Sequence, residues 1–269
     1  MRLKMDTPNF ADYILNEKDY SAKLEIIYLL SKRQKIFFDK SVVFKAELAR
    51  LFLKYNSLGL DENIVLTACL LCNCKKVDNV QEIGKLKNYA KEGAEYLRQL
   101  GFEQRFCKIC EEVNRYSGSS PRERESDVLE LVDQFGGMLL NREERIGFEA
   151  DEALVLLKHR NLKDIFNRYI DTFEQFVTLI DGLEIEGIVS MKVLKRMTKL
   201  YNETGENMDF IKKILYDFEP KVEKIMNSKI KDIKEEMFEK DNSCRPLFTE
   251  ETTKKIIGDI ETKTRTEAN

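Results

Sequence analysis

The sequence has few of the residues that interrupt helices. Its 269 residues include 12 glycines, 4 prolines and no tryptophan, whereas 42% of the residues are hydrophobic and 35% are charged. Glycine and proline destabilise the interior of a helix, so long segments without them favour helices. No segment shows the alternating polar and apolar pattern of a strand. We therefore expect an all-α protein.

Long apolar runs and strongly basic runs are also missing. No window reaches the ~18 consecutive apolar residues of a membrane-spanning helix, and residues 1–21 lack the apolar core of a signal peptide. The net charge is −3, from 45 basic and 48 acidic side chains, and basic runs are mixed with acidic residues. We expect a soluble, cytoplasmic protein that binds neither nucleic acid nor membrane.

Histidine is nearly absent, whereas cysteine is not. The single His159 has no second histidine or cysteine beside it, so we interpret it as a surface or helix-end residue. Four of the six cysteines, Cys72, Cys74, Cys107 and Cys110, would supply the number of thiolates that a structural zinc needs. On a helix, however, Cys72 and Cys74 lie about 200° apart. We favour buried, reduced thiols, and the zinc site remains the alternative.

The apolar spacing divides the chain into four parts. Residues 1–39 predict short helices, 40–182 a larger helical domain, 183–240 a helical extension, and 241–269 a polar tail that is partly disordered. Within the larger domain, residues 66–74 are apolar almost all round, which is typical of a central buried helix. We expect helix stops at Gly59 and Gly101 and an N-cap at Ser126 or Asp127.

The helical extension carries an apolar stripe that must be covered. The core of the protein, a second copy or another protein could cover it. We expect the C-terminal helices to bind a protein partner or form a homodimer, with docking onto the core as the alternative. The stripe consists of Val189, Val193, Met197, Phe210, Ile211, Ile214, Leu215 and Phe218.

Four segments resemble successive motifs of one family. ACLLCNCKKVDN resembles an apolar helix ending in Leu-Leu-His-Asp-Ile-Gly-Lys, and NYAKEGAEYLRQLGF resembles a His-Pro-x-x-Gly segment. NRYSGS resembles a Glu-Arg-Tyr-Asp-Gly loop, and LELVDQFGGML resembles the helix that carries Ala-Asp-x-Phe-Asp. Through these segments, residues 40–178 resemble the HD superfamily of metal-dependent phosphohydrolases, most closely its HD-GYP branch. The resemblance implies an HD-like helical bundle.

The same resemblance implies that the family's metal ligands have been replaced here. In that family, histidines and carboxylates hold two or more divalent metals, which activate water to attack a phosphodiester. The replaced positions correspond to Phe44, Cys72, Asn73, Tyr89, Glu112 and Val113. The last carboxylate remains as Asp133 and the family lysine as Lys76, while the Gly-Tyr-Pro signature is missing.

The resemblance therefore implies a non-catalytic regulatory or protein-interaction module without a cofactor. A nucleotide-like ligand could still bind in the degenerate cleft, with phosphate held by Lys76, Arg115 and the pair Arg122 and Arg124. The alternative is a divergent phosphodiesterase or phosphohydrolase with Asp133, Glu112, Asn73 and Cys72 around one divalent metal. The candidate ligand-binding residues are Cys72, Asn73, Lys76, Tyr89, Glu112, Arg115 and Asp133.

Overall fold

The computed structural model confirms an all-α protein. The structure describes residues 10–34, 36–76, 89–113, 121–142, 145–161, 167–187 and 189–243. The chain forms two compact units, Met1–Val222 and Glu223–Asn269, and each is treated by itself below. The helices of the first unit are α1 (Phe10–Asn16), α2 (Tyr20–Gln34), α3 (Lys40–Tyr55), α4 (Glu62–Leu71), α6 (Tyr89–Gln99), α7 (Gln104–Glu111), α8 (Arg124–Leu139), α9 (Ala150–Asn161), α10 (Ile170–Asp181), α11 (Val193–Glu203), α12 (Asn207–Lys213) and the π-helical turn η3 (Ile214–Phe218).

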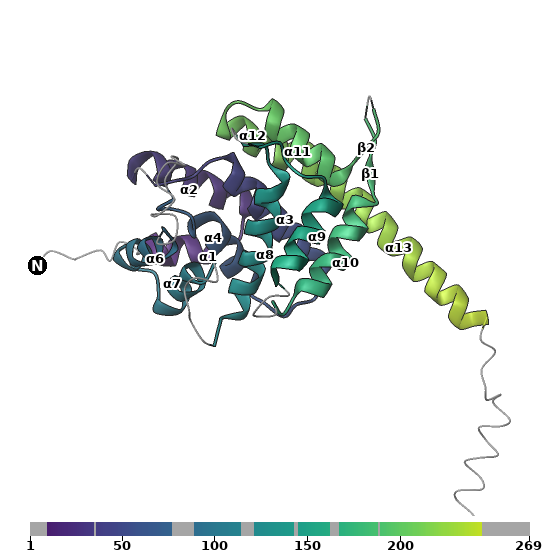
Figure 1. Cartoon of the computed structure of the whole chain (residues 1–269), viewed down its shortest axis with the longest axis horizontal. Coiled ribbons are helices and arrows are strands. Elements are labelled where there is room, and N and C mark those ends of the chain that lie inside the picture. Colours follow the sequence, from purple (N-terminus) through teal and green to yellow (C-terminus); the bar gives the residue numbers. More distant parts are fainter. Residues whose placement is uncertain are drawn as a thin grey trace, which may run out of the picture. The chain divides into compact units, whose positions relative to one another are not determined.

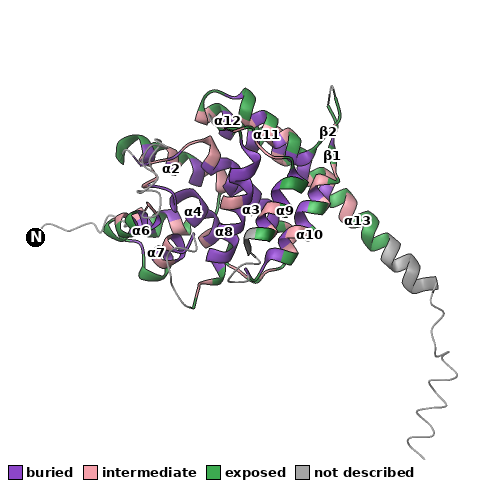
Figure 2. Cartoon of the chain, in the orientation of Figure 1, coloured by how far each residue is buried: buried purple, intermediate pink, exposed green. Residues whose placement is uncertain are grey.

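Helices α3, α4 and α8 form the centre of the first unit (Figure 1). All three are mostly buried (Figure 2), and α3 packs against both of the others. Asp39 caps α3 by accepting hydrogen bonds from the backbone N–H groups of Ser41 and Val42, and Asp61 caps α4 in the same way. These caps satisfy backbone donors that a helix leaves unpaired at its start.

The expected stops at Gly59 and Gly101 coincide with left-handed backbone conformations. Their φ angles are +62° and +91°, which glycine adopts without the steric cost that other residues meet. Gly59 lies four residues beyond the end of α3, and Gly101 lies two beyond the end of α6. The spacing of apolar residues and these two glycines therefore located the helix ends to within a few residues.

The expected N-cap of α8 is wrong. The helix begins at Arg124 with Glu123 as its N-cap, so Ser126 and Asp127 lie inside the first turn. Both side chains have other partners: the Ser126 hydroxyl donates to Glu112 Oε2 (2.7 Å), and Asp127 pairs with Arg122. Tertiary partners, rather than local capping, determine where this helix begins.

A short hairpin forms the only sheet in the described residues. Strands β1 (Glu184–Ile185) and β2 (Met191–Lys192) pair antiparallel, with Ile185 opposite Met191. Strands of two residues are too short to leave an alternating pattern in the sequence, so no sequence signal predicted them.

The apolar stripe of residues 189–218 is covered mostly within the first unit. Helices α11 and α12 both contact α3. Tyr201 on α11 lies between Phe44 on α3 and Phe210 on α12, with ring centroids 6.1 and 5.8 Å apart in edge-to-face geometry. Intramolecular docking therefore covers this stripe, apart from exposed Val189 and half-buried Leu215. The buried members are Val193, Met197, Phe210, Ile211, Ile214 and Phe218.

Four phenylalanines join α10 to the central helices. Phe173 on α10 packs edge-to-face against Phe52 on α3 and Phe135 on α8, with centroid distances of 5.1 and 5.4 Å. Phe176 lies 5.3 Å from Phe52. Aromatic rings of this size contribute much of the apolar area that a core buries.

Helix α13 (Glu219–Ser243) runs into the second unit, which begins at Glu223. In the described part of this unit, Ile233 is an exposed apolar residue among Lys231, Asp232 and Lys234. No described helix of the chain is long and apolar enough to cross a membrane.

Candidate functional site

Three helices meet at one carboxylate inside the first unit. Oδ1 of Asp133, on α8, accepts a hydrogen bond from the Lys45 ammonium on α3 (2.7 Å) and one from Asn73 Nδ2 just after α4 (3.2 Å). Lys45 exposes 6% of its side chain and Asp133 22%, and Asn73 is 2% exposed. Lys76, three residues after Asn73, adds a positive charge that acts on Asp133. We call these four residues the Asp133 centre.

The end of α4 positions two members of this centre. The apolar run of α4 ends at Leu71, and Cys72 caps it by donating its backbone N–H to Ala68 O (2.8 Å). A tight turn follows, in which the N–H of Lys76 bonds to Asn73 O (2.8 Å). The turn carries Asn73 and Lys76 to the same end of the buried helix.

A pair of glycines on α8 makes room for Lys45. A Cβ atom at Gly136 would lie 2.9 Å from Lys45 Cγ, closer than such atoms approach one another. The side chain of Lys45 therefore passes against the bare backbone of α8 to reach Asp133, one helical turn earlier. Lys45 was not among the predicted site residues, although the pair Gly136 and Gly137 inside a helix is a signal of a close approach by another group.

The charges of the centre perturb one another. Burial alone would raise the pKa of the Asp133 carboxyl, but Lys45, Lys76 and the hydrogen bonds from Lys45 and Asn73 hold that pKa below its ordinary value. Burial lowers the pKa of Lys76, and the nearby positive charges of Lys45 and Arg142 lower it further. Asp133 is therefore an ionised carboxylate neutralised by the chain itself.

The ammonium of Lys76 has fewer polar partners than that of Lys45 among the described residues. Within the described residues its ammonium makes no hydrogen bond or ion pair and lies 5.8 Å from the ring centroid of Phe37. Arg142, which acts on Lys76 as a like charge, reaches Gly137 O at 3.5 Å. Asp133 and Asp39 act on Lys76 as opposite charges, but no described side chain accepts a hydrogen bond from its ammonium.

Glu112, the C-cap residue of α7, lies beside the start of α8. Its carboxylate is fully buried and accepts hydrogen bonds from the Ser126 hydroxyl (2.7 Å) and the Glu123 N–H (2.8 Å). Ser126 lies seven residues before Asp133, which places the two carboxylates about 10 Å apart along the helix. Glu112 therefore accepts the hydrogen bonds of donors at the start of α8. Because of its separation from Asp133, one metal ion could not bind both carboxylates.

The other described candidates are not members of the Asp133 centre. Tyr89 is half-buried and begins α6. Arg115 lies outside the described residues. Cys72 is buried beside the centre, and burial first, then the negative charge of Asp133, raises the pKa of its thiol. A protonated thiol is a poor nucleophile and a poor metal ligand.

The five described cysteines are free and buried. Burial raises the pKa of each thiol, to about 12 for Cys74. The other four thiols also act electrostatically on Cys110, which indicates that the five residues lie in one region. No three histidine, cysteine or carboxylate side chains in the described part of the chain are arranged to hold a metal.

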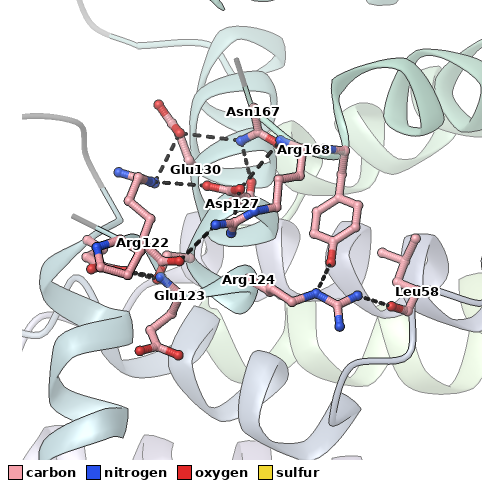
Figure 3. Close-up of polar contacts among 12 residues, drawn as sticks. Leu58, Arg122, Glu123, Arg124, Asp127, Glu130, Asn167 and Arg168 are labelled. Atoms are coloured by element: carbon pink, nitrogen blue, oxygen red, sulfur yellow. Dashed lines mark hydrogen bonds and ion pairs between the residues drawn. The ribbon is translucent and has the colours of Figure 1, made fainter. Parts of the chain in front are cut away.

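A second polar network lies at the start of α8 (Figure 3). Arg122 pairs with Asp127 (3.1 Å) and Glu130 (3.2 Å), and Arg168 also pairs with Asp127 (3.1 Å). The Asn167 amide donates to the backbone carbonyl of Asp127 (2.8 Å). Two guanidinium groups thus neutralise two buried carboxylates, and the network ties residues 122 and 167–168 to α8.

Arg124 is likewise held by protein groups. It donates to the Tyr169 hydroxyl (3.0 Å) and to Leu58 O (2.7 Å), as Figure 3 shows. The two arginines that we expected to bind phosphate, Arg122 and Arg124, therefore both make structural contacts. The partners of Arg124 come from distant segments, which no local pattern could predict, whereas those of Arg122 lie on the helix that follows it.

Comparison with protein-family models, with curated proteins and with solved structures finds no match to this chain. The fold defines the chain as an all-helical globular protein, and the Asp133 centre is a largely buried polar cluster that joins the three central helices.

Replacing Lys45 by methionine should destabilise the protein, because the Asp133 carboxylate loses its ion-pair partner. Breaking a buried ion pair typically costs ~3–5 kcal/mol, and because Asp133 retains some exposure we expect a loss of about 2–3 kcal/mol in the free energy of unfolding at pH 7. Without Lys45 the pKa of Asp133 should rise, because only Lys76 and the Asn73 hydrogen bond then oppose the effect of burial. The deficit should therefore shrink as the pH falls toward 4 and Asp133 takes up a proton.

Denaturant titrations at pH 7 and pH 4.5 measure this effect. The matched control is the double variant Lys45→Met with Asp133→Asn, which removes both charges and should recover most of the loss. A deficit that is the same at both pH values and in the double variant would show that Lys45 contributes packing rather than charge.

Proposed function

We propose that this chain is a non-catalytic regulatory module related to the HD phosphohydrolases, in which Lys45 supplies the positive charge that a metal supplies in an active member. The observation that carries the proposal is the 2.7 Å ion pair between Lys45 and Asp133. Asp133 is the one carboxylate that the resemblance retains as a family ligand. An ammonium bonded to its Oδ1 competes with any cation for that oxygen.

The other replaced positions support the same proposal. Phe44, at the position of the first family histidine, is fully buried and packs against Tyr201. Cys72 carries a thiol with a raised pKa, and Glu112 is engaged about 10 Å away along α8. A hydrolytic metal site needs several anionic or imidazole ligands around one point.

A reduced metal site is the second candidate. One observation favours it: Asn73 Oδ1 is buried and accepts no hydrogen bond from the described residues. A buried acceptor without a donor is costly, and a cation could satisfy it. In that case Asp133 and Asn73 would share a single divalent ion, and Lys45 would have to move.

We further propose that the regulatory input is a phosphate-bearing, nucleotide-like ligand at Lys76. Lys76 makes no ion pair within the described residues, and Lys45 and Arg142 add positive charge around it. Bringing an anion to this point would relieve the repulsion among the three cations and supply an acceptor for the Lys76 ammonium.

The regulatory output that we propose is association of two copies through the second unit. The stripe formed by residues 193–218 is mostly buried, so association through the second unit would use apolar positions on α13. Ile230 is half-buried and Ile233 is 36% exposed, three residues apart on this helix. Residues at this spacing share one helix face, which a second α13 could cover.

The non-catalytic proposal predicts that protein purified without chelator carries well under one equivalent of divalent metal. It also predicts no hydrolysis of cyclic dinucleotides in the presence of manganese or iron. Elemental analysis and product chromatography test both. Turnover that disappears in Asp133→Asn but persists in the exposed-carboxylate control Glu149→Gln would overturn the proposal in favour of the reduced metal site.

The ligand proposal predicts that cyclic di-GMP or inorganic phosphate binds the wild-type protein. The variant Lys76→Met should bind at least about tenfold more weakly, since a charge-assisted hydrogen bond contributes ~1.5–3 kcal/mol. Its neighbour Lys75, whose ammonium lies 3.9 Å from the Tyr96 ring centroid, provides the control Lys75→Met. Calorimetry that detects no binding to the wild type, or equal losses in both variants, would contradict it.

The association proposal predicts a concentration-dependent dimer in size-exclusion chromatography with light scattering. Ile233→Lys should shift the protein to monomer because it places a charge in the apolar contact, whereas Ser228→Lys, at an exposed position of the same helix, should not. A wild-type protein that stays monomeric at all concentrations would remove self-association from the proposed function.

A further inference from the structure

We propose that Lys23 is a pH-dependent latch that holds α1 against α2 and α4, and that the latch tightens as the pH rises. Lys23 lies on α2 and is 1% exposed. Its Nζ donates to Ile14 O in the last turn of α1 (2.6 Å) and to the Thr67 hydroxyl on α4 (2.7 Å). One amine therefore joins three helices.

Helix α1 depends on this connection. It has seven residues, fewer than a helix needs to be stable by itself in water. Only Ala11 and Ile14 are buried, and Ile14 O is one of the terminal carbonyls that a helix leaves without an internal partner. A further bond joins Asn63 Nδ2 of α4 to Leu15 O. Docking on α4 thus stabilises α1, and Lys23 is the buried polar link.

The acceptors around Lys23 suit a neutral amine better than an ammonium. Two acceptors are present, Ile14 O and Thr67 Oγ1, and the Thr67 hydroxyl uses its own proton to bond Asn63 O (2.7 Å). A neutral amine has two N–H donors, whereas an ammonium has three and a full charge. No carboxylate lies within ion-pair distance of Lys23 in the described residues, so a buried charge there would lack a partner.

The carboxylates near Lys23 do not offset the effect of burial on its pKa. Glu17, in the turn after α1, and Asp61, at the start of α4, both favour the protonated amine, but burial dominates and lowers the pKa of Lys23 to about 8. The other groups that α1 and α4 present to Lys23 are the neutral Ile14 carbonyl and Thr67 hydroxyl.

The sign of the pH dependence follows from these two states. When α1 undocks and Lys23 meets water, its pKa returns to about 10.4. Between pH 8 and 10.4 the undocked state binds more protons, so the docked state gains stability as the pH rises. Below about pH 7 the amine is protonated in both states, and docking is at its weakest. From pH 7 to pH 9 the opening equilibrium should become about tenfold less favourable.

The effect must be measured locally because the buried thiols act in the opposite direction. Burial raises the pKa values of Cys69, Cys72, Cys74 and Cys110, so global stability falls as the pH passes the unfolded value of about 8.5. Opening of α1 alone leaves these thiols on α4 and α7 in place. A global melting curve would therefore mix two effects of opposite sign.

Hydrogen exchange of the α1 amides, read by mass spectrometry and corrected for the intrinsic rate at each pH, tests the latch. In the wild type the protection of residues 10–16 should rise about tenfold from pH 7 to pH 9. In Lys23→Met the rise should vanish. In Lys32→Met, which removes an exposed lysine from the same helix, it should remain.

A direct titration of the Lys23 amine in the wild-type protein by NMR guards against a variant that fails to fold. A pKa near 8 together with the pH-dependent protection supports the latch. Either a pKa near 10.4 for the Lys23 amine or a rise in protection that is equal in Lys23→Met and the wild type would overturn it.

Discussion

The Lys45–Asp133 ion pair joins α3 to α8 at the point where α4 ends, and these three helices carry the rest of the first unit. At the crossing point α8 presents the backbone of Gly136, which leaves room for the Lys45 side chain. The outer helices attach to this centre through aromatic contacts, such as those of Phe173 and Tyr201. A change at Lys45 therefore acts on the packing of the whole unit and on its charge balance together.

Most buried charges in the first unit are neutralised within the chain. Arg50 forms a bidentate pair with Glu47 and reaches Glu219 at 3.0 Å, and Arg122 bridges Asp127 and Glu130. Such pairs gain little net stability, because desolvation offsets the attraction, but they tolerate only one arrangement of their helices. Lys23 and Lys76 differ, because neither has an ion-pair partner among the described residues. We therefore propose Lys23 as a residue that responds to pH and Lys76 as one that responds to a ligand.

The sequence predicted features that depend on local pattern and missed those that depend on distant partners. The helical class, the burial of Cys72 and the glycine stops follow from periodicity and backbone preference. Lys45 was not predicted because a lysine in a helix is usually solvated, and its partner lies 88 residues away. The start of α8 was misplaced for the same reason: Ser126 bonds to Glu112 rather than to its own helix.

A metal-binding helical bundle that loses its histidines faces a physical problem, because a retained carboxylate in the core becomes an uncompensated charge. Removing the carboxylate would solve the problem, and so would supplying a cation from the chain. Here Asp133 remains, Lys45 pairs with it, and Asn73 fills the second hydrogen-bonding position. Because Lys45 pairs with Asp133, the Lys76 ammonium makes no ion pair among the described residues, although the charges of Asp133 and Asp39 still act on it. On this reasoning, the loss of metal chemistry and the gain of a positively charged position for an anionic ligand have one cause.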